Sequence, residues 1–427
     1  MNYKKEKVSD NEVKFNVTVD NKDFLNTENE IFNKKKNKFQ IDGFRKGHVD
    51  KNIVFKYYGR GILFDDVANE LVNSSLNEIL KDDEERVISR PEVSVTDIGP
   101  DKDFVYEAKF GIVPDFKPAT YKGVEVDKIE SKFDEKRIDE IIENERYKNS
   151  RLVSVEREAK NNDVVNIDFD GYIDNKQFDG GKAEKFDLTL GSKSFIDNFE
   201  DQIVGHRVND EFDVNVKFPD DYQAANLKGK NATFKVKINE IKERVMPEVN
   251  DEFISEISQF DKLDDYKEDL RKNLKEQADK AAEDQMTAKI VDKILENTEI
   301  KLSPLSEDYA VENYIEDFNN RLYRSGMDLN TYLKYINKTY EDFEKDCKDI
   351  AVKNMKRTIL LEEIGKIENI EVTDEVIEKE IENMAKAYGM DIKRFKDAYA
   401  NENERKELKR NLFIPEVLKF IFNNAKI

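Results

Sequence analysis

The sequence predicts an α+β multidomain protein, and three observations support this. The chain has 427 residues, which is more than one hydrophobic core usually holds, so we expect roughly two to four domains. Charged residues make up 39% of it, yet 27 Phe and 17 Tyr are too many for a disordered chain. The patterning also changes twice, from mixed α/β, to a glycine-rich antiparallel β region with a short helix, to an all-α region.

The first region, residues 1–112, mixes strands and helices. Val13 to Val19 alternates apolar and polar residues, as does Phe104 to Phe110, and both stretches are expected to be strands. A lysine-rich helix is expected over 23–38. Apolar residues recur at helical spacing over 64–80, which predicts an amphipathic helix.

Pro114 and Pro118 predict an extended linker, which we place at residues 113–149. A compact β domain is expected over 150–245, because short alternating stretches there are separated by glycines suited to turns. Residues 246–427 contain only three prolines and carry apolar residues every three or four positions. This last region is therefore expected to be almost wholly helical.

Several classes of function lack the residues that they need. The only cysteine is Cys347 and the only histidines are His48 and His206, so disulfides within the chain are excluded, and few residues are left for zinc sites or Ser-His-Asp triads. We expect no cofactor and no metal. The chain has no apolar run of membrane-spanning length, and its charged N-terminus is unlike a signal peptide. These features favour the reducing cytoplasm.

A short loop stands out against the acidic composition. Gly43-Phe44-Arg45-Lys46-Gly47 places a phenylalanine and two cations between glycines that permit a tight turn. Residues 33–60 hold nine Lys or Arg against two Asp, although the net charge of the chain is −21. Such a patch suits RNA or an acidic protein surface. The alternative is an ordinary basic turn with an inward-facing Phe44.

The stretch from Ile41 to Val49 resembles the ribosome-docking signature of the trigger factor family. The resemblance implies an α/β ribosome-docking domain whose loop binds the large ribosomal subunit near the peptide exit tunnel. Gly43, Phe44, Arg45, Lys46 and Gly47 would be the docking residues. His48 stands where the family usually has Lys, and Asp50 where it usually has Pro. The loop thus loses one cation and gains one anion, a change in the direction of weaker docking.

The middle region resembles the FKBP-type peptidyl-prolyl isomerases, in the divergent form that trigger factors carry. The matching stretches span about ninety residues. They are Asp168–Gly171, Phe178–Gly181, Phe186–Gly191, Phe195–Glu200, Phe218–Tyr222, Asn226–Lys230 and Thr233–Phe234.

Isomerisation of an X-Pro bond has a barrier of about 18–20 kcal/mol and makes or breaks no covalent bond. A dry apolar pocket can therefore catalyse it by binding the twisted amide better than the planar one. The resemblance implies that Phe199 is the pocket floor, that Asp179 orients the amide and that Tyr222 lies at the rim. The full predicted set is Phe169, Phe178, Asp179, Phe195, Ile196, Phe199, Tyr222 and Phe234. The alternative is that these aromatics are simply the core of a small β domain.

The helical region carries no motif of catalytic residues, and amphipathic helices most often form a packed bundle. The resemblance implies helical arms that leave apolar faces open for unfolded chains. Candidate faces contain Met286, Ile290 and Ile294, or Met355, Ile359 and Leu360. Sequence alone does not separate open faces from packed ones.

Two functions from different classes remain open. The first is a ribosome-associated chaperone that also isomerises X-Pro bonds. The second is a binding-only holdase with an inactive FKBP-like domain. The expected partners are the large ribosomal subunit and nascent or unfolded polypeptides, with no membrane and no DNA. The resemblance also allows a homodimer away from the ribosome.

Overall fold

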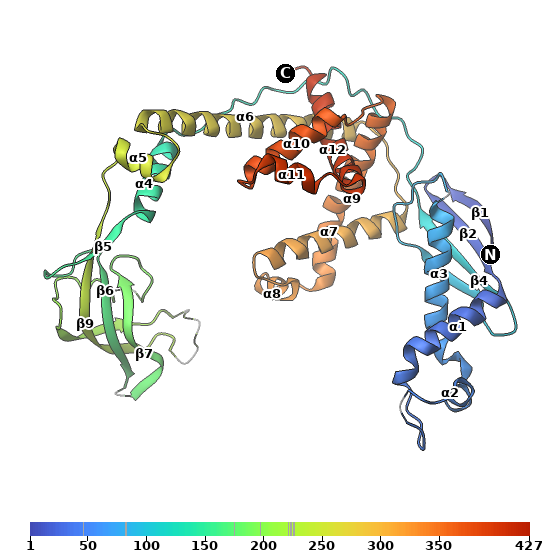
Figure 1. Ribbon diagram of the computed structural model, residues 1–427, viewed down its shortest axis with the longest axis horizontal. Helices are drawn as coiled ribbons and strands as arrows, with labels where there is room; N and C mark the ends of the chain where they lie inside the picture. Colours follow the sequence, from blue (N-terminus) through green and yellow to red (C-terminus); the bar gives the residue numbers. More distant parts are fainter. Residues whose placement is uncertain are drawn as a thin grey trace. The chain divides into compact units, whose positions relative to one another are not determined.

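The computed structural model describes residues 1–427 apart from positions 46, 82, 175, 197, 221, 223, 225 and 226, and apart from the side chain of residue 179. The described residues form two compact units (Figure 1). One comprises Met1–Ile129 with Glu283–Ile427, and the other comprises Glu130–Ala282.

The first unit begins with a four-stranded antiparallel sheet in the order β1-β2-β4-β3. Its strands are β1 (Asn2–Ser9), β2 (Glu12–Val19), β3 (Glu92–Asp97) and β4 (Phe104–Gly111). Alternate residues of β2 and β4 point to one face and are buried there, as a half-buried strand requires. Helices α1 (Asn21–Lys35) and α3 (Phe64–Lys81) contribute their apolar faces to the same core.

The chain between α1 and α3 forms one end of this domain (Figure 1). It contains η1 (Lys36–Lys38), a loop, α2 (Lys51–Tyr58) and η2 (Arg60–Leu63). The Asp50 carboxylate caps α2 by accepting a hydrogen bond from the Asn52 N–H at 2.8 Å. Gly59 ends α2 with a φ of 82°, a conformation that favours glycine.

The helical part of the first unit contains the end of α6 (Leu263–Glu296) and six further helices. They are α7 (Pro304–Arg324), α8 (Leu329–Tyr335), α9 (Tyr340–Ile367), α10 (Asp374–Ala387), α11 (Ile392–Ala398) and α12 (Glu402–Asn423). Ser, Thr, Asp or Asn precedes each of these six, and its side chain accepts a backbone N–H of the first turn. Helices α7 to α9 share one apolar core, and α10 to α12 share another.

The N-terminal sheet and the helices of this unit pack against each other. Gly111 at the end of β4 lies against the start of α7, where an added Cβ would come within 2.1 Å of the Ser306 Oγ and 2.5 Å of the Ser303 Oγ. Residues 113–129 then run extended along α6, α9 and α12. They contribute several side chains to the apolar core that these three helices share. The Val124 C=O accepts the Lys426 N–H at 2.9 Å, which joins this segment to the C-terminal end of the chain.

The second unit contains a five-stranded antiparallel sheet with the path β5-β9-β6-β7, in which β8 also pairs with β9. The strands are β5 (Arg151–Ser154), β6 (Val164–Ile173), β7 (Lys176–Thr189), β8 (Glu211–Lys217) and β9 (Asn231–Val245). Register shifts within β6 bend the sheet around its apolar core. Helices α4 (Lys136–Lys148) and α5 (Asp251–Ile257) and the beginning of α6 complete the unit.

Most of the expected elements are confirmed, and two details differ. The segment expected to be an extended linker contains α4, because Ile138 and Ile142 bury one helical face against Leu274 of α6. The sequence also predicts a short helix in the β domain, but none of the described residues between 150 and 245 is helical, and residues 198–205 form a series of turns. Asn198 begins these turns with a φ of 68°, outside the right-handed helical region.

None of the described helices combines the length and the apolar character that crossing a bilayer requires.

Candidate functional site

An apolar pocket opens in the β domain of the second unit. Its volume is about 560 Å³, and it collects side chains from three strands and from the loops after β7 and β8. The lining residues are Phe169, Phe178, Gly180, Ser194, Phe195, Ile196, Phe218, Pro219, Tyr222, Ala224, Leu227 and Phe234. Among the described lining side chains, only Ser194 and Tyr222 carry polar groups.

The pocket brings together six of the predicted site residues, namely Phe169, Phe178, Phe195, Ile196, Tyr222 and Phe234. Phe199 does not line it. Its fully buried ring lies behind the lining rings, with centroids 4.6 Å from that of Phe195 and 5.3 Å from that of Phe234. Asp179 belongs to β7, but its side chain lies outside the described residues.

Phe178 is held between two glycines. A Cβ added to Gly171 or to Gly181 would come within 2.9 Å of the Phe178 ring. The ring also makes edge contacts with Phe218 and Phe234 at 5.8 Å. Because the glycines at positions 171 and 181 have no side chain, Phe178 can pack directly on the strand backbone.

Sequence reasoning missed several lining residues, and it also missed the anchor of the Phe195 loop. The Glu200 carboxylate is buried and accepts the backbone N–H groups of Lys193, Ser194 and Phe195 at 3.0 to 3.2 Å. Burial alone would raise the pKa of Glu200, but these hydrogen bonds outweigh it and lower the pKa. Glu200 thus fixes the loop that presents Phe195 and Ile196.

The loop around Phe44 projects from the N-terminal domain. Its ends are anchored in the core by the buried residues Phe39, Ile41 and Val49. Phe44 is 45% exposed, so the alternative of an inward-facing ring is wrong. Gly43 and Gly47 have φ values of 86° and 80°, which explains the two glycines. Arg45 is exposed beside Phe44, and Lys46 lies outside the described residues.

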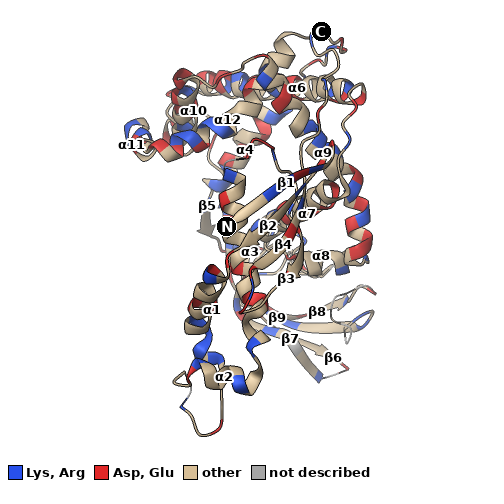
Figure 2. Cartoon of the chain, turned by 90° about the vertical axis from the view of Figure 1, so that its right-hand side faces the viewer, with Lys and Arg blue, Asp and Glu red and all other residues tan. Residues whose placement is uncertain are grey.

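Fewer of the cations around this loop are unpaired than the sequence suggests. Figure 2 shows Lys and Arg positions gathered at the end of α1 and around α2. Three of these cations are paired, because Lys35 contacts Asp66 while Lys51 and Arg60 both bind Glu28. Lys34, Lys36, Lys38 and Lys56 are exposed and, within the described part of the chain, form no ion pair.

Glu28 connects the elements on either side of the loop. Its side chain on α1 is fully buried and accepts the Lys51 ammonium at 2.8 Å and the Arg60 Nε at 3.1 Å. Both cations also lie over the Phe55 ring. Burial would raise the pKa of Glu28, but hydrogen bonds from Arg60 and Lys51 and their charges lower it.

We predict that Glu28→Gln destabilises the α1–α2 region by about 1–3 kcal/mol at pH 7, because it leaves two cations without their counter-ion. The depressed folded pKa of Glu28 means that this stability is complete above the unfolded value, near 4.5, and is lost as the pH falls through the folded value. Hydrogen exchange of the α1 and α2 amides should therefore be faster in the variant at pH 7. The difference should shrink at pH 3.5, and equal exchange at pH 7 would contradict the prediction.

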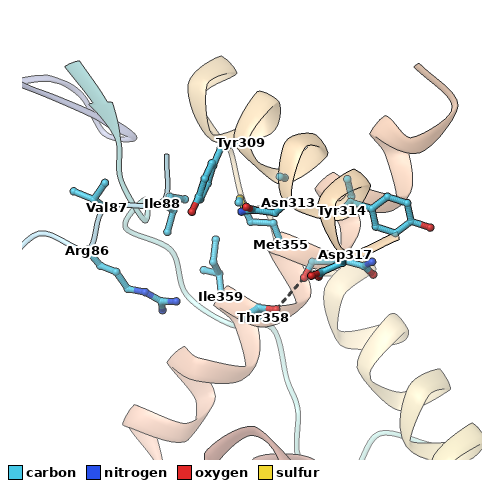
Figure 3. A pocket seen from close by; sticks show the side chains of 13 residues that line it. Arg86, Val87, Ile88, Tyr309, Asn313, Tyr314, Asp317, Met355, Thr358 and Ile359 are labelled. Carbon is cyan, nitrogen blue, oxygen red and sulfur yellow. Dashed lines mark hydrogen bonds between the residues drawn. The ribbon is translucent and has the colours of Figure 1, made fainter. Parts of the chain in front are cut away.

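A second pocket, of about 410 Å³, lies in the first unit between α7, α9 and residues 86–88 (Figure 3). Its lining includes Tyr309, Asn313 and Tyr314 of α7 and Met355, Thr358 and Ile359 of α9. The other apolar candidates of the helical region are core residues. Met286, Ile290, Ile294 and Leu360 are each less than 8% exposed.

The antiparallel sheet and aromatic pocket of the second unit define an FKBP-type isomerase domain, and the family model for FKBP-type peptidyl-prolyl cis-trans isomerase matches residues 155–239. The models for bacterial trigger factor protein and for its C-terminus match residues 1–145 and 262–423. The chain belongs to the trigger factor family.

Relatives match along the whole chain. The trigger factor of Caldicellulosiruptor saccharolyticus is 36% identical over 427 residues, which cover 100% of this chain and 97% of that protein. The trigger factor of Clostridium kluyveri is 36% identical over 429 residues and is covered completely. A solved structure of the trigger factor chaperone aligns over 99% of both chains, with 23% identity and a TM-score of 0.47.

Proposed function

We propose that the protein is a cytoplasmic, ribosome-associated chaperone that shields nascent chains and catalyses cis-trans isomerisation of X-Pro bonds. The observation that carries the proposal is the pocket, because a domain that matches the FKBP-type family has a pocket whose described lining is mostly apolar. Membership of the trigger factor family supports ribosomes and nascent chains as partners.

The pocket suits a reaction that needs no acid, base or nucleophile. Rotation about the X-Pro bond breaks amide resonance, and the twisted amide is less polar than the planar one. A site that excludes water favours the twisted form, and it lowers the barrier only by the difference in binding between the two forms. In this scheme the proline ring enters among Phe169, Phe178 and Phe234, and Tyr222 at the rim contacts the neighbouring backbone.

Catalytic amounts of the full chain are therefore expected to speed cis-trans exchange in an X-Pro peptide, measured by NMR exchange. An unchanged exchange rate would leave the second candidate, a binding-only holdase. The described pocket favours the first candidate, because every described predicted residue lines the pocket or packs directly behind it.

Gly181→Ala should lower the isomerase rate by roughly tenfold or more, since small displacements of groups in a site have large effects on rate. The new Cβ would lie 2.9 Å from the Phe178 ring, so the ring must move away from its place in the pocket. The NMR exchange rate measures the loss. A variant with the wild-type rate would show that the position of Phe178 is unimportant.

Docking is proposed to use Phe44, Arg45 and Lys46, with Gly43 and Gly47 shaping the loop. Phe44 would fill an apolar depression while the two cations meet anionic groups of the large subunit. The proposed client surface is the pocket between α7 and α9, where apolar side chains lie beside amide and hydroxyl groups able to bind a peptide backbone.

Salt should weaken ribosome binding, because two of the three docking side chains are cations whose attraction is screened. Co-sedimentation with vacant large subunits between 50 and 500 mM salt measures the effect. Affinity that is constant across this range would show that Phe44 and other apolar contacts dominate docking.

A further inference from the structure

Helix α2 and the η2 turn after it carry a second exposed aromatic feature that the docking loop does not explain. Tyr57 is 64% exposed, and Tyr58 and Ile62 are 40% and 42% exposed. Large apolar surface left open on a small, highly charged domain indicates a binding surface. None of these three residues belongs to the Gly43–Gly47 loop.

The two tyrosine rings are held in place. The Tyr58 hydroxyl donates to the Gln40 C=O at 2.6 Å, and its ring lies 5.8 Å from that of the buried Phe39. The Tyr57 ring packs edge-on against Tyr58, with a centroid distance of 4.8 Å and an angle of 69°. Tyr57 is therefore supported by an ordered neighbour while most of its surface stays open to a ligand.

In the stretch of sequence that carries these rings, residues 33–60, cations outnumber carboxylates. Lys56 precedes Tyr57, and the segment that carries Phe39 also carries the exposed Lys34, Lys36 and Lys38. Glu28 and Asp66 pair with Lys51, Arg60 and Lys35. Among the described cations of this stretch, those that form no ion pair include the exposed Lys34, Lys36, Lys38 and Lys56. The acidic residues of this stretch are Asp42 and Asp50, and Asp50 is engaged in capping α2.

Lysines beside exposed rings fit RNA better than a protein partner. Lysine is depleted in protein–protein interfaces, whose centres are desolvated. Unpaired nucleotides need both features, since their bases stack on aromatic side chains and their phosphates attract cations. We propose that Tyr57, supported by Tyr58 and flanked by Lys56, stacks on an unpaired nucleotide of ribosomal RNA. This proposal rests on the proposed ribosome docking and adds a second, RNA-directed contact to it.

Affinity for vacant large ribosomal subunits tests the proposal with three substitutions in the full chain. Tyr57→Leu keeps apolar bulk but removes the stacking ring, and it should weaken binding about tenfold. Tyr57→Phe should bind like the wild type, because the ring is kept. Tyr335→Leu is the matched control, since Tyr335 is 85% exposed on α8 and should not affect docking.

Arg45→Ala, measured in parallel, separates the two claims. If Arg45→Ala weakens binding while Tyr57→Leu does not, the stacking proposal is overturned and docking stands. If neither substitution changes affinity, the stacking proposal fails, and so does the claim that Arg45 contributes to docking.

A photoreactive benzophenone amino acid in place of Tyr57 identifies the partner class on the same subunits. Crosslinks to ribosomal RNA are expected. Crosslinks confined to ribosomal proteins would overturn the RNA assignment.

Discussion

Replacing Phe44, Arg45 and Lys46 together by alanine should abolish co-sedimentation with large ribosomal subunits while the fold stays intact. Phe44 is exposed at the tip of a loop whose ends are buried, so the substitutions remove contact groups without opening the core. The loss of an apolar anchor and two cations should lower affinity by at least about a hundredfold, since central interface residues each contribute about 2 kcal/mol or more.

A double variant, Tyr323→Ala with Arg324→Ala, is the matched control for this experiment. It also removes one exposed aromatic ring and one neighbouring cation, but from the end of α7. The control should sediment like the wild type. Unchanged sedimentation of the triple variant would show that the loop is not the docking element.

The second large effect is expected in the pocket. Phe195→Ala removes a half-buried lining ring, and Phe199→Ala removes the buried ring behind it. Each should lower the NMR exchange rate of an X-Pro peptide by about a hundredfold, because the difference in binding between the twisted and planar amide depends on a dry, closely packed site.

Phe199→Ala also costs about 3–5 kcal/mol of packing, so its effect on rate has to be separated from unfolding of the domain. Phe195 is partly exposed, and Phe195→Ala therefore reports on the pocket with less effect on stability. Phe212→Ala is the matched control, because this ring stacks on His206 and does not line the pocket. A folded Phe195→Ala variant with the wild-type rate would contradict the pocket assignment.

Local patterns predicted the secondary structure well where one face of an element is buried. The alternation from Val13 to Val19 and the helical spacing over 64–80 both correspond to elements that bury one face in the same core. These periods follow directly from strand and helix geometry. The aromatic residues of the pocket could be named only through family resemblance, since alternation alone does not separate a pocket from a core.

Contacts between residues distant in the sequence could not be predicted. Nothing local indicates that Glu28 neutralises Lys51 and Arg60, which lie 23 and 32 positions further on. The sequence therefore overstates the unpaired positive charge around the Phe44 loop. The same limit explains the helical region. Met286 and Met355 have similar spacing to their apolar neighbours, yet Met286 belongs to the core and Met355 lines a pocket.

Isomerisation of folding proteins is tested by refolding a proline-limited model protein with substoichiometric amounts of the full chain. The slow folding phase should become faster in proportion to the amount of chain added, with one molecule serving many clients. A slow phase that is unchanged, or that responds only when chain and client are equimolar, would contradict this expectation, because the FKBP-like domain would then bind clients without isomerising them.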